Sequence, residues 1–307
     1  MLSVVKSESI KRPFYDGESY TTEDTENAEI KIFPHKDREP QIMTLDYNWN
    51  KIAGELIEGS RGMLWRTHSD RINSELLDRW LPVGRRQRVL KTDLFDEAVS
   101  DGLYPAMNRK SKYIFGMDLS MRILLDVTTS HPDIMSLCAD VRRLPFADGV
   151  FDYVVSNSTL DHFTRDDEIV SALQEVYRIL RPGGRVILTL DNPVNPVLAL
   201  RRLLPFGFLR QLGLLPYYVG RTYSPWQLRR VLERLGMEVM ELGTVMHFPR
   251  VLVVMLGRVM AKIMGSRMNG QFLKLIMAFE GMAGLPTGYL TGYFVAVSAQ
   301  KKDRQPS

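Results

Sequence analysis

Asp118, Asp140 and Asn157 each come directly after a run of mainly apolar residues. A carboxylate can accept hydrogen bonds from both hydroxyls of a ribose. Asp118 lies about 25 residues after the preceding strand-like run, close to the interval of about 20 found in dinucleotide-binding folds. These residues therefore predict a nucleoside site. The alternative for the two aspartates is a structural role as a helix cap or turn residue.

The segment after Asn157 contains a candidate base, His162, which directly follows Asp161. Histidine side chains titrate near neutral pH, so His162 could take a proton from a hydroxyl or an amine of an acceptor. The alternative is a histidine that hydrogen bonds hold in a structural position.

Strand-like and helical patterns alternate around these residues. The sequence predicts one helix from a cap at Ser69 to the region of Pro82, and another over 168–180 that ends before a Pro-Gly-Gly turn. Strands are expected at 88–94, 112–117, 134–139, 151–156 and 185–190. This alternation predicts a parallel, doubly wound sheet, in which ligands bind at the carboxyl ends of the strands.

Beyond residue 191 the alternation becomes less regular. Prolines, glycines and apolar clusters at 193–222 predict a lid, and a methionine-rich helical segment at 248–288 predicts a second one. Between the lids, Ser224 can cap a helix that Pro225 opens and that runs to residue 235, followed by a strand that begins at 236–240. The residues at 292–299 predict the last strand of the sheet.

The middle of the chain resembles the class I S-adenosylmethionine (SAM)-dependent methyltransferases, in particular the type 11 branch that includes the quinone-biosynthesis methyltransferases. The segments that carry the resemblance are Tyr113 to Asp118, Cys138-Ala139-Asp140, Leu144-Pro145-Phe146 and Phe151 to Asn157. The resemblance implies an α/β fold with a Rossmann-like, doubly wound, mostly parallel seven-stranded sheet and a helical cap insertion. It also implies three regions: a polar arm over 1–64, the methyltransferase-like domain over 65–300 and a tail over 301–307.

The resemblance implies SAM as the cofactor and gives several residues a place around it. Asp118, with Leu119 beside it, would bind the ribose, and Asp140 would accept from the adenine amino group with Val141 next to the ring. Asn157 and Ser158 would lie along the methionyl part. His162 would then lie near the floor of the active site.

The first strand departs from the family pattern. A glycine-rich loop normally follows this strand and lets the backbone approach the cofactor, but here the sequence is Lys91-Thr92-Asp93-Leu94-Phe95-Asp96-Glu97. One interpretation is that Asp93, Asp96 or Glu97 meets the ammonium or sulfonium of SAM while Lys91 meets its carboxylate. A second is that SAM binding has been lost. The third, a divalent ion on the acids, is a weak hypothesis, and no metal site is predicted.

The resemblance predicts methyl transfer to a small acceptor that is apolar or lipid-linked. His162, Asp161 and Tyr218 are the candidate catalytic residues, and Tyr217, Tyr223 and His247 also lie in segments that cover the pocket in this family. Two other functions stay open. The chain could be a methyltransferase-like binding or scaffold protein without activity, or an enzyme that uses the same fold for other chemistry such as cyclisation.

Composition and charge narrow the expected surroundings. The single cysteine and the lack of a signal-like or membrane-spanning apolar run predict a cytoplasmic protein. Basic residues concentrate in the C-terminal half, where residues 197–235 hold seven arginines and one acid. A basic, apolar surface indicates peripheral contact with a membrane or an anionic ligand, although solvated helix faces would read the same way. No nucleic-acid-binding signature is present, and the oligomeric state is left open.

Overall fold

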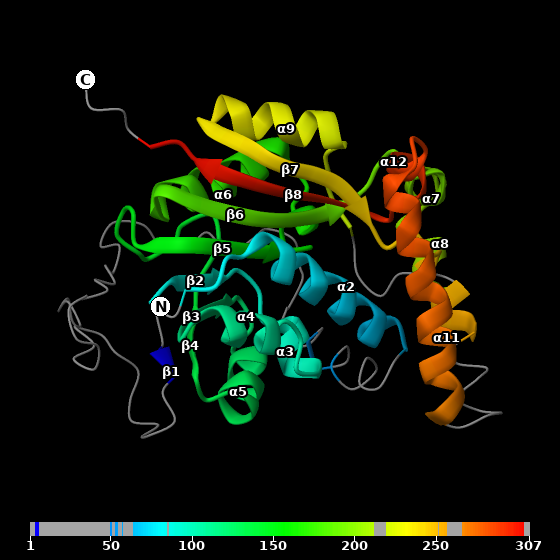
Figure 1. Ribbon diagram of the computed structural model, residues 1–307, viewed down its shortest axis with the longest axis horizontal. Coiled ribbons are helices and arrows are strands. Elements are labelled where there is room, and N and C mark those ends of the chain that lie inside the picture. Colours follow the sequence, from blue (N-terminus) through cyan, green and yellow to red (C-terminus); the bar gives the residue numbers. More distant parts are fainter. Residues whose placement is uncertain are drawn as a thin grey trace.

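The computed structural model describes residues 4–5, 50, 53–54, 57, 64–84, 86–211, 219–250, 252–256 and 266–303. Its strands form one mixed sheet with the order β1-β4-β3-β2-β5-β6-β8-β7 (Figure 1). The strands are β1 (Val4–Val5), β2 (Arg88–Lys91), β3 (Tyr113–Asp118), β4 (Ile134–Cys138), β5 (Phe151–Asn157), β6 (Leu180–Asp191), β7 (Met237–Val245) and β8 (Phe294–Lys301). The five neighbouring strands β4, β3, β2, β5 and β6 run parallel to one another. Strand β8 pairs antiparallel with both β6 and β7. The predicted doubly wound, mostly parallel sheet of seven strands is confirmed.

One strand of this sheet was not expected. β1 comes from the segment predicted as a polar arm, and it pairs antiparallel with β4 through Val4 opposite Leu137 and Val5 opposite Ser136. This pairing covers the edge of β4. It therefore adds an eighth strand to the seven that the resemblance implied.

Helices cover both faces of the sheet and enclose two apolar cores. The helices before the lids are α2 (Leu64–Trp80), α3 (Phe95–Val99), α4 (Tyr104–Lys110), α5 (Met121–Ser130), η1 (Leu160–His162) and α6 (Asp166–Ile179). The core on one face contains apolar residues of α2, α4 and α5. The other core contains those of α6 and of α9 (Pro225–Arg234). The sheet thus separates two layers of helices, as expected for a doubly wound fold.

Local sequence explains the helices that were predicted best. In α6 the residues Ile169, Leu173 and Val176 recur on one face and are almost completely buried. In α9 the side chain of Ser224 accepts from the backbone N–H of Gln227, whose side chain accepts from the N–H of Ser224 in return. Both helices therefore lie where periodicity and capping placed them.

Three predicted boundaries were wrong. The strand expected at 185–190 begins at residue 180, because β6 runs from Leu180 to Asp191 and includes the predicted turn. Ser69 is not a helix cap but a buried residue inside α2, which begins at least as early as Leu64. The first strand ends at Lys91 instead of residue 94, because Phe95 already opens the short helix α3. The polar residues between this strand and this helix form the altered loop.

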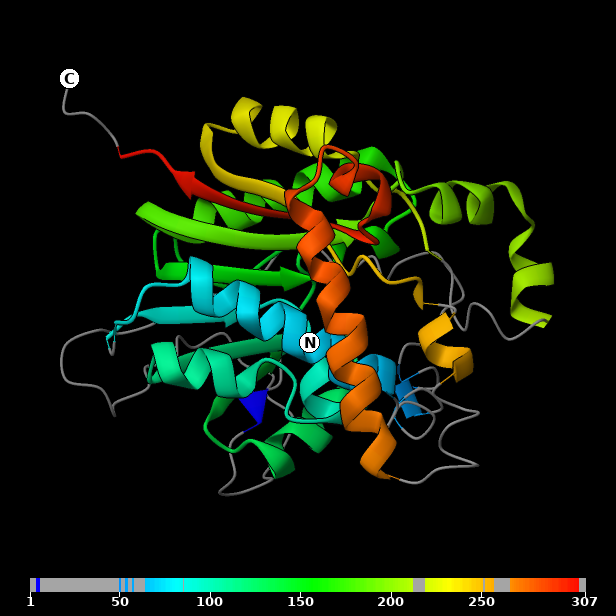
Figure 2. The ribbon, with the colours of Figure 1, turned by 45° about the vertical axis from the view of Figure 1, so that its right-hand side comes forward.

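The two predicted lids contain helices. The first holds α7 (Pro196–Leu203) and α8 (Phe206–Gln211), and the second holds α11 (Ser266–Ala278), η2 (Phe279–Gly284) and α12 (Gly288–Thr291). In Figure 1 α7, α8, α11 and α12 lie at one end of the view, and Figure 2 shows that α7 and α8 stand apart from α11. Tyr217 and Tyr218 lie outside the described residues. Among the residues that are described, no helix is both long and apolar enough to cross a membrane.

Candidate functional site

A pocket opens at the carboxyl ends of β2, β3 and β5, where parallel sheets usually bind ligands. Its volume is about 180 Å³. The described residues that line it come from these strand ends, from α2 and from the segment after β7. They are Ala53, Trp65, Arg66, Ser69, Asn73, Thr92, Asp93, Phe95, Asp96, Met117, Asp118, Leu119, Ile123, Ala139, Val141, Asn157, Ser158, Thr159, His162, Phe163, Met246, Arg250 and Phe294.

Asp118 ends β3 and lines this pocket. One oxygen of its carboxylate accepts from the backbone N–H of Leu94 at 3.0 Å, and the other accepts from that of Ser120 at 2.8 Å. Each oxygen keeps a second lone pair, so the group can still accept from a ligand hydroxyl. Burial raises the pKa of Asp118 to about 6, and the two N–H donors oppose that rise.

Asp140 differs from its two sequence neighbours in its position relative to the pocket. Ala139 and Val141 line the pocket, but Asp140 is not among the described lining residues. Its carboxylate instead holds the guanidinium of Arg142, with distances of 2.6 Å and 3.1 Å, and Arg142 also pairs with Glu168 at 2.7 Å. The predicted contact between Asp140 and adenine stays a prediction, and the carboxylate has an internal partner in this structure.

Asn157 and Ser158 connect β5 to the rest of the site. The amide of Asn157 donates to Asp96 at 2.9 Å and accepts from the hydroxyl of Thr189 at 2.6 Å. Ser158 has a φ of 54°, which is uncommon for residues other than glycine, and its hydroxyl donates to Asp161 at 2.9 Å. These bonds fix the turn that carries η1 to the floor of the pocket.

His162 lines the pocket, whereas Asp161 lies buried behind it. The Nε2 atom of His162 is 4.0 Å from a carboxylate oxygen of Asp161. Burial raises the pKa of Asp161, and the nearby His162 opposes that rise. The two residues are adjacent, but 4.0 Å is longer than the hydrogen bond by which a carboxylate orients a base, and of the two only His162 lines the pocket.

The next segment of the chain packs directly against this floor. The N–H of Gly220 donates to the backbone oxygen of Asp161 at 2.7 Å, and that of Arg221 donates to Phe163 at 2.6 Å. A Cβ atom on Gly220 would lie 2.0 Å from the oxygen of Phe163. Only glycine allows this approach.

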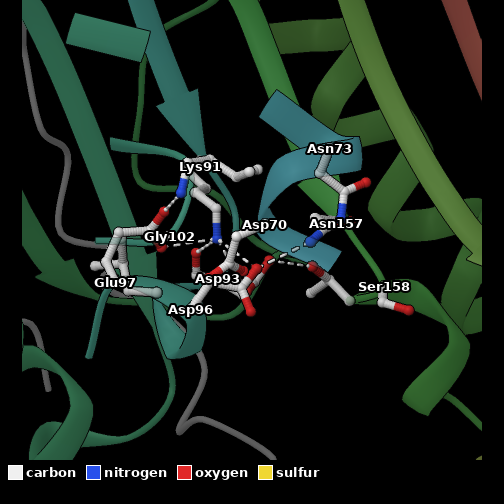
Figure 3. A network of polar contacts seen from close by, with 12 residues as sticks. Asp70, Asn73, Lys91, Asp93, Asp96, Glu97, Gly102, Asn157 and Ser158 are labelled. Carbon is white, nitrogen blue, oxygen red and sulfur yellow. Dashed lines mark hydrogen bonds and ion pairs between the residues drawn. The ribbon is translucent and has the colours of Figure 1, made fainter. Parts of the chain in front are cut away.

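Lys91 lies inside a cluster of carboxylates where the family has its glycine-rich loop (Figure 3). Its side chain is completely buried, and its ammonium is 2.9 Å from Glu97, 3.2 Å from the carboxylate of Asp93 and 3.7 Å from Asp96. It also donates to the backbone oxygen of Asp93 at 2.8 Å. Burial alone would lower the pKa of Lys91, but the carboxylates outweigh it and raise the pKa. Lys91 therefore keeps its positive charge, and its ammonium binds carboxylates of the protein itself.

The carboxylates of the cluster respond differently to their surroundings. Burial raises the pKa of Glu97 to about 7, and burial together with the charge of Asp96 raises that of Asp70 to about 7. Burial would also raise the pKa of Asp96, but Arg66 and Lys91 overcome it and lower the pKa. The lowered pKa keeps Asp96 ionised, and Asp96 lines the pocket.

Lys91 is not among the described lining residues, whereas Arg66 is. Arg66 comes from α2, forms an ion pair with Asp96 and lies over the ring of Phe95 at 5.3 Å. Sequence analysis missed Arg66 and Asn73, which also line the pocket from α2. Their spacing of seven residues places them on one face of the helix, and that was the available signal.

Leu94 fills space that a glycine-rich loop would leave open. A Cβ atom on Gly116 in β3 would lie 2.6 Å from a methyl carbon of Leu94. The glycine in the neighbouring strand therefore makes room for a leucine in the loop.

The other two candidate residues, His247 and Tyr223, are buried and packed within the protein. His247 is buried, with Nδ1 2.8 Å from the hydroxyl of Thr291 and Nε2 3.1 Å from the backbone oxygen of Thr244. Tyr223 is buried in the core beside α6 and α9. Within the described part of the chain, no group of histidines, cysteines and carboxylates is arranged to hold a metal ion.

Comparison with known proteins shows similarity to methyltransferases. Residues 99–188 match the family model described as a methyltransferase domain. Demethylmenaquinone methyltransferase of Beutenbergia cavernae is 28% identical over 177 residues, which are 57% of this chain and 65% of that protein. The ubiquinone/menaquinone biosynthesis C-methyltransferase UbiE of Haemophilus ducreyi is 38% identical over 77 residues, which are 24% of this chain and 29% of that protein. The chain thus spans under two thirds of the length of either relative.

Solved structures agree with the fold. A SAM-dependent methyltransferase of Thermotoga maritima has a TM-score of 0.53 and 18% identity, with 83% of this chain and 99% of that chain covered. The methyltransferase bound to the Trm112 activator of Haloferax volcanii has a TM-score of 0.52 and 14% identity, with 82% and 98% covered. The resemblance to the SAM-dependent methyltransferases is confirmed by the matched domain and by the fold. Family and fold together imply S-adenosylmethionine as the cofactor.

Proposed function

We propose that this protein transfers a methyl group from SAM to a small, apolar acceptor. The observation that supports the proposal best is the composition of the pocket wall. It combines a carboxylate at a strand end, Asp118, with the apolar side chains of Met117 and Val141 and with the acidic Asp93 and Asp96.

These residues match the chemical groups of SAM. Asp118 has acceptor capacity for the ribose hydroxyls, and Val141 with Ala139 offers an apolar surface for a flat ring. Asp93 and Asp96 favour the positively charged sulfonium and ammonium. Arg66 can pair with the carboxylate, which is the role that the sequence suggested for Lys91.

The pocket is small for such a ligand. Its volume of about 180 Å³ is below the range of roughly 300 to 1,000 Å³ that is common for ligand sites. Admission of a cofactor therefore requires side chains to move outward. Arg66 is well placed for this movement because its long, flexible side chain reaches from α2 to Asp96.

The chain's own contribution to the reaction is alignment and exclusion of water. Bound SAM supplies a methyl group that its sulfonium makes electrophilic. The rings of Trp65 and Phe294 and the side chain of Met246 form an apolar part of the lining, which suits an acceptor without charge. His162 is placed to take the proton that an acceptor hydroxyl or carbon loses on methylation.

The names of the relatives give the first acceptor to try. Both are methyltransferases of quinone biosynthesis, so we propose a reduced quinone precursor, with a lipid-linked ring, as the acceptor class. Contact with a membrane would bring such a substrate to the pocket.

Calorimetric titration with SAM and with S-adenosylhomocysteine tests the first half of the proposal. Saturable binding of both ligands with one site per chain is expected, and absence of heat with either would overturn it. Incubation with SAM and reduced demethylmenaquinone carrying a short side chain tests the second half. Equal amounts of methylated product and S-adenosylhomocysteine are expected.

The Lys91 cluster favours a second candidate, a binding protein without activity. The cluster and Leu94 occupy the position of the glycine-rich loop, so the methionyl end of SAM has less room than in the family. Binding of both ligands without turnover on any quinol would favour this candidate. His162→Gln distinguishes the two further, because an active enzyme should lose turnover while SAM affinity is kept.

A further inference from the structure

Among the described residues, most of the exposed large hydrophobic side chains lie in or next to the two lids. We call this set the apolar patch. It consists of Val197, Leu200, Leu203, Leu204, Phe208, Leu252, Met255, Leu256, Leu275, Phe279, Leu285 and Leu290. Leu203 is 80% exposed and Leu200 is 60% exposed, which is unusual for leucines that neighbour one another on one helix. Exposed apolar side chains that cluster along a helix, as on α7, often mark an interaction site.

The patch belongs to one end of the molecule. In Figure 1 α7, α8, α11 and α12 lie at the end toward which β5 and β6 point, and Figure 2 shows α7 and α8 projecting to one side of α11. The pocket opens at the same end, and two of its lining residues, Met246 and Arg250, come from the segment that leads into the second lid. The patch residues Leu252 and Met255 therefore follow the pocket residue Arg250 closely in the sequence.

The charge of these segments has a single sign. Residues 192–232 contain six arginines and no acid, and three of these arginines pair with carboxylates outside the range, Arg201 with Asp191, Arg221 with Asp166 and Arg229 with Glu233. Residues 242–279 contain four arginines or lysines beyond Arg250 and again no acid. Arg202 and Lys274 are exposed next to patch leucines. Glu280, which follows the second segment, turns inward and accepts from the backbone N–H groups of Met246 and His247 at 3.0 Å and 2.9 Å.

We propose that the apolar patch docks on an anionic lipid membrane. Leucines and a phenylalanine that project from several short helices can enter the interface between headgroups and acyl chains, while arginine and lysine pair with anionic headgroups. The lack of carboxylates over both segments is the charge complement of such a surface. The docking is carried by the patch alone, and its use to collect a lipid-linked acceptor rests on the proposed function.

Vesicle co-sedimentation of the full-length protein tests this proposal. Binding is expected to phosphatidylcholine vesicles that contain about one third phosphatidylglycerol, with weaker binding to pure phosphatidylcholine and partial release at high salt. The double variant Leu200→Glu with Leu203→Glu should lose most of the binding. Replacing Arg202 and Lys274 by alanine should weaken it by about fivefold for each charge.

Matched controls separate docking from general effects. Val83→Glu with Leu125→Glu places the same charge on exposed apolar residues outside the lids and should leave vesicle binding unchanged. SAM calorimetry on the patch variants should match the parent protein, so failure of docking and failure of the proposed function can be told apart.

Three results would overturn the proposal. The first is absence of binding to both kinds of vesicle. The second is equal loss of binding in the control variant. The third is a concentration-dependent dimer in sedimentation velocity that the Leu200 and Leu203 changes abolish, because the patch would then be the contact between two copies of the chain.

Discussion

The ammonium of Lys91 lies 2.9 Å from a carboxylate oxygen of Glu97, and both side chains are completely buried. A charge in such a position is tolerated only while its partner is present, because removal of one member leaves the other desolvated and unpaired. This pair stands where the family would have flexible glycines. Ion pairs between Lys91 and the carboxylates of Asp93 and Glu97 therefore hold the loop after β2 in place.

Lys91→Met should destabilise the protein strongly. Loss of one member of a buried ion pair typically costs about 3 to 5 kcal/mol, and here Glu97 would be left without its ammonium. Urea denaturation measures the free energy of unfolding. Adding Glu97→Gln to Lys91→Met should restore more than half of the loss, and a single variant as stable as the parent would contradict the structural role of the pair.

Glu97 should also make stability depend on pH. Its pKa rises from 4.5 to about 7 on folding, so between these values the folded state holds a proton that the unfolded state has lost. The contribution of Glu97 is therefore complete below about pH 4.5 and disappears as the pH rises to about 7, with a slope of at most about 1.4 kcal/mol per pH unit.

The measurement is the difference between the parent protein and Glu97→Gln in urea denaturation from pH 5 to pH 8. Taking the difference removes the opposite effect of the buried His68, whose pKa burial lowers from 6.5 to about 4. The difference should change across this range. Parallel profiles for the two proteins would show that Glu97 does not titrate as expected.

Asp118→Ala should weaken binding of SAM and of S-adenosylhomocysteine to a similar degree, because both carry the same ribose. Hydrogen bonds to a charged group contribute about 1.5 to 3 kcal/mol, which corresponds to roughly 10- to 100-fold in affinity. Calorimetry gives the affinities, and thermal unfolding shows whether the loss of the bonds from Leu94 and Ser120 disturbs the fold. Asp126→Ala, a change at a surface ion pair of α5, is the control. Unchanged affinity in a folded Asp118→Ala protein would remove Asp118 from the ribose site.

Gly220→Ala should disturb the floor of the pocket from outside. The added Cβ would lie 2.0 Å from the oxygen of Phe163, so either residues 219–222 or the turn at Asp161 to Phe163 must move, at a cost of about 1 to 3 kcal/mol. Thermal unfolding and SAM titration should both be affected. Gly243→Ala meets no atom within 4 Å and should behave like the parent. A normal Gly220→Ala protein would show that the contact with Phe163 is easily relaxed.

Sequence reasoning located the strand ends well because polar residues mark them. Asp118 and Asn157 end β3 and β5 and line the pocket, since the pattern of apolar strands fixes both the ends and the edge of the sheet at which they meet. The same reasoning did not predict that Lys91 is buried. Lysine is rarely buried, and only the fold brings Glu97 and Asp96 close enough to keep it there.

The contribution of α2 was also beyond the sequence pattern. Its apolar residues predict a helix but do not say which end of the sheet it crosses. The sequence therefore could not place Arg66 and Asn73 at the pocket. Asp140 shows the opposite case. Its position after β4 was predicted, yet Arg142, two residues further on, decides where its carboxylate points.

The contact between Leu94 and Gly116 links the altered loop after β2 to the neighbouring strand β3. A side chain at residue 116 would collide with Leu94, and a glycine at residue 94 would leave a void beside β3. Neither position can change alone without a cost in packing. Glycine at residue 94 would therefore have to be combined with a larger residue at 116 to keep the packing beside β3, so the conformation of the loop and the sequence of the neighbouring strand depend on each other.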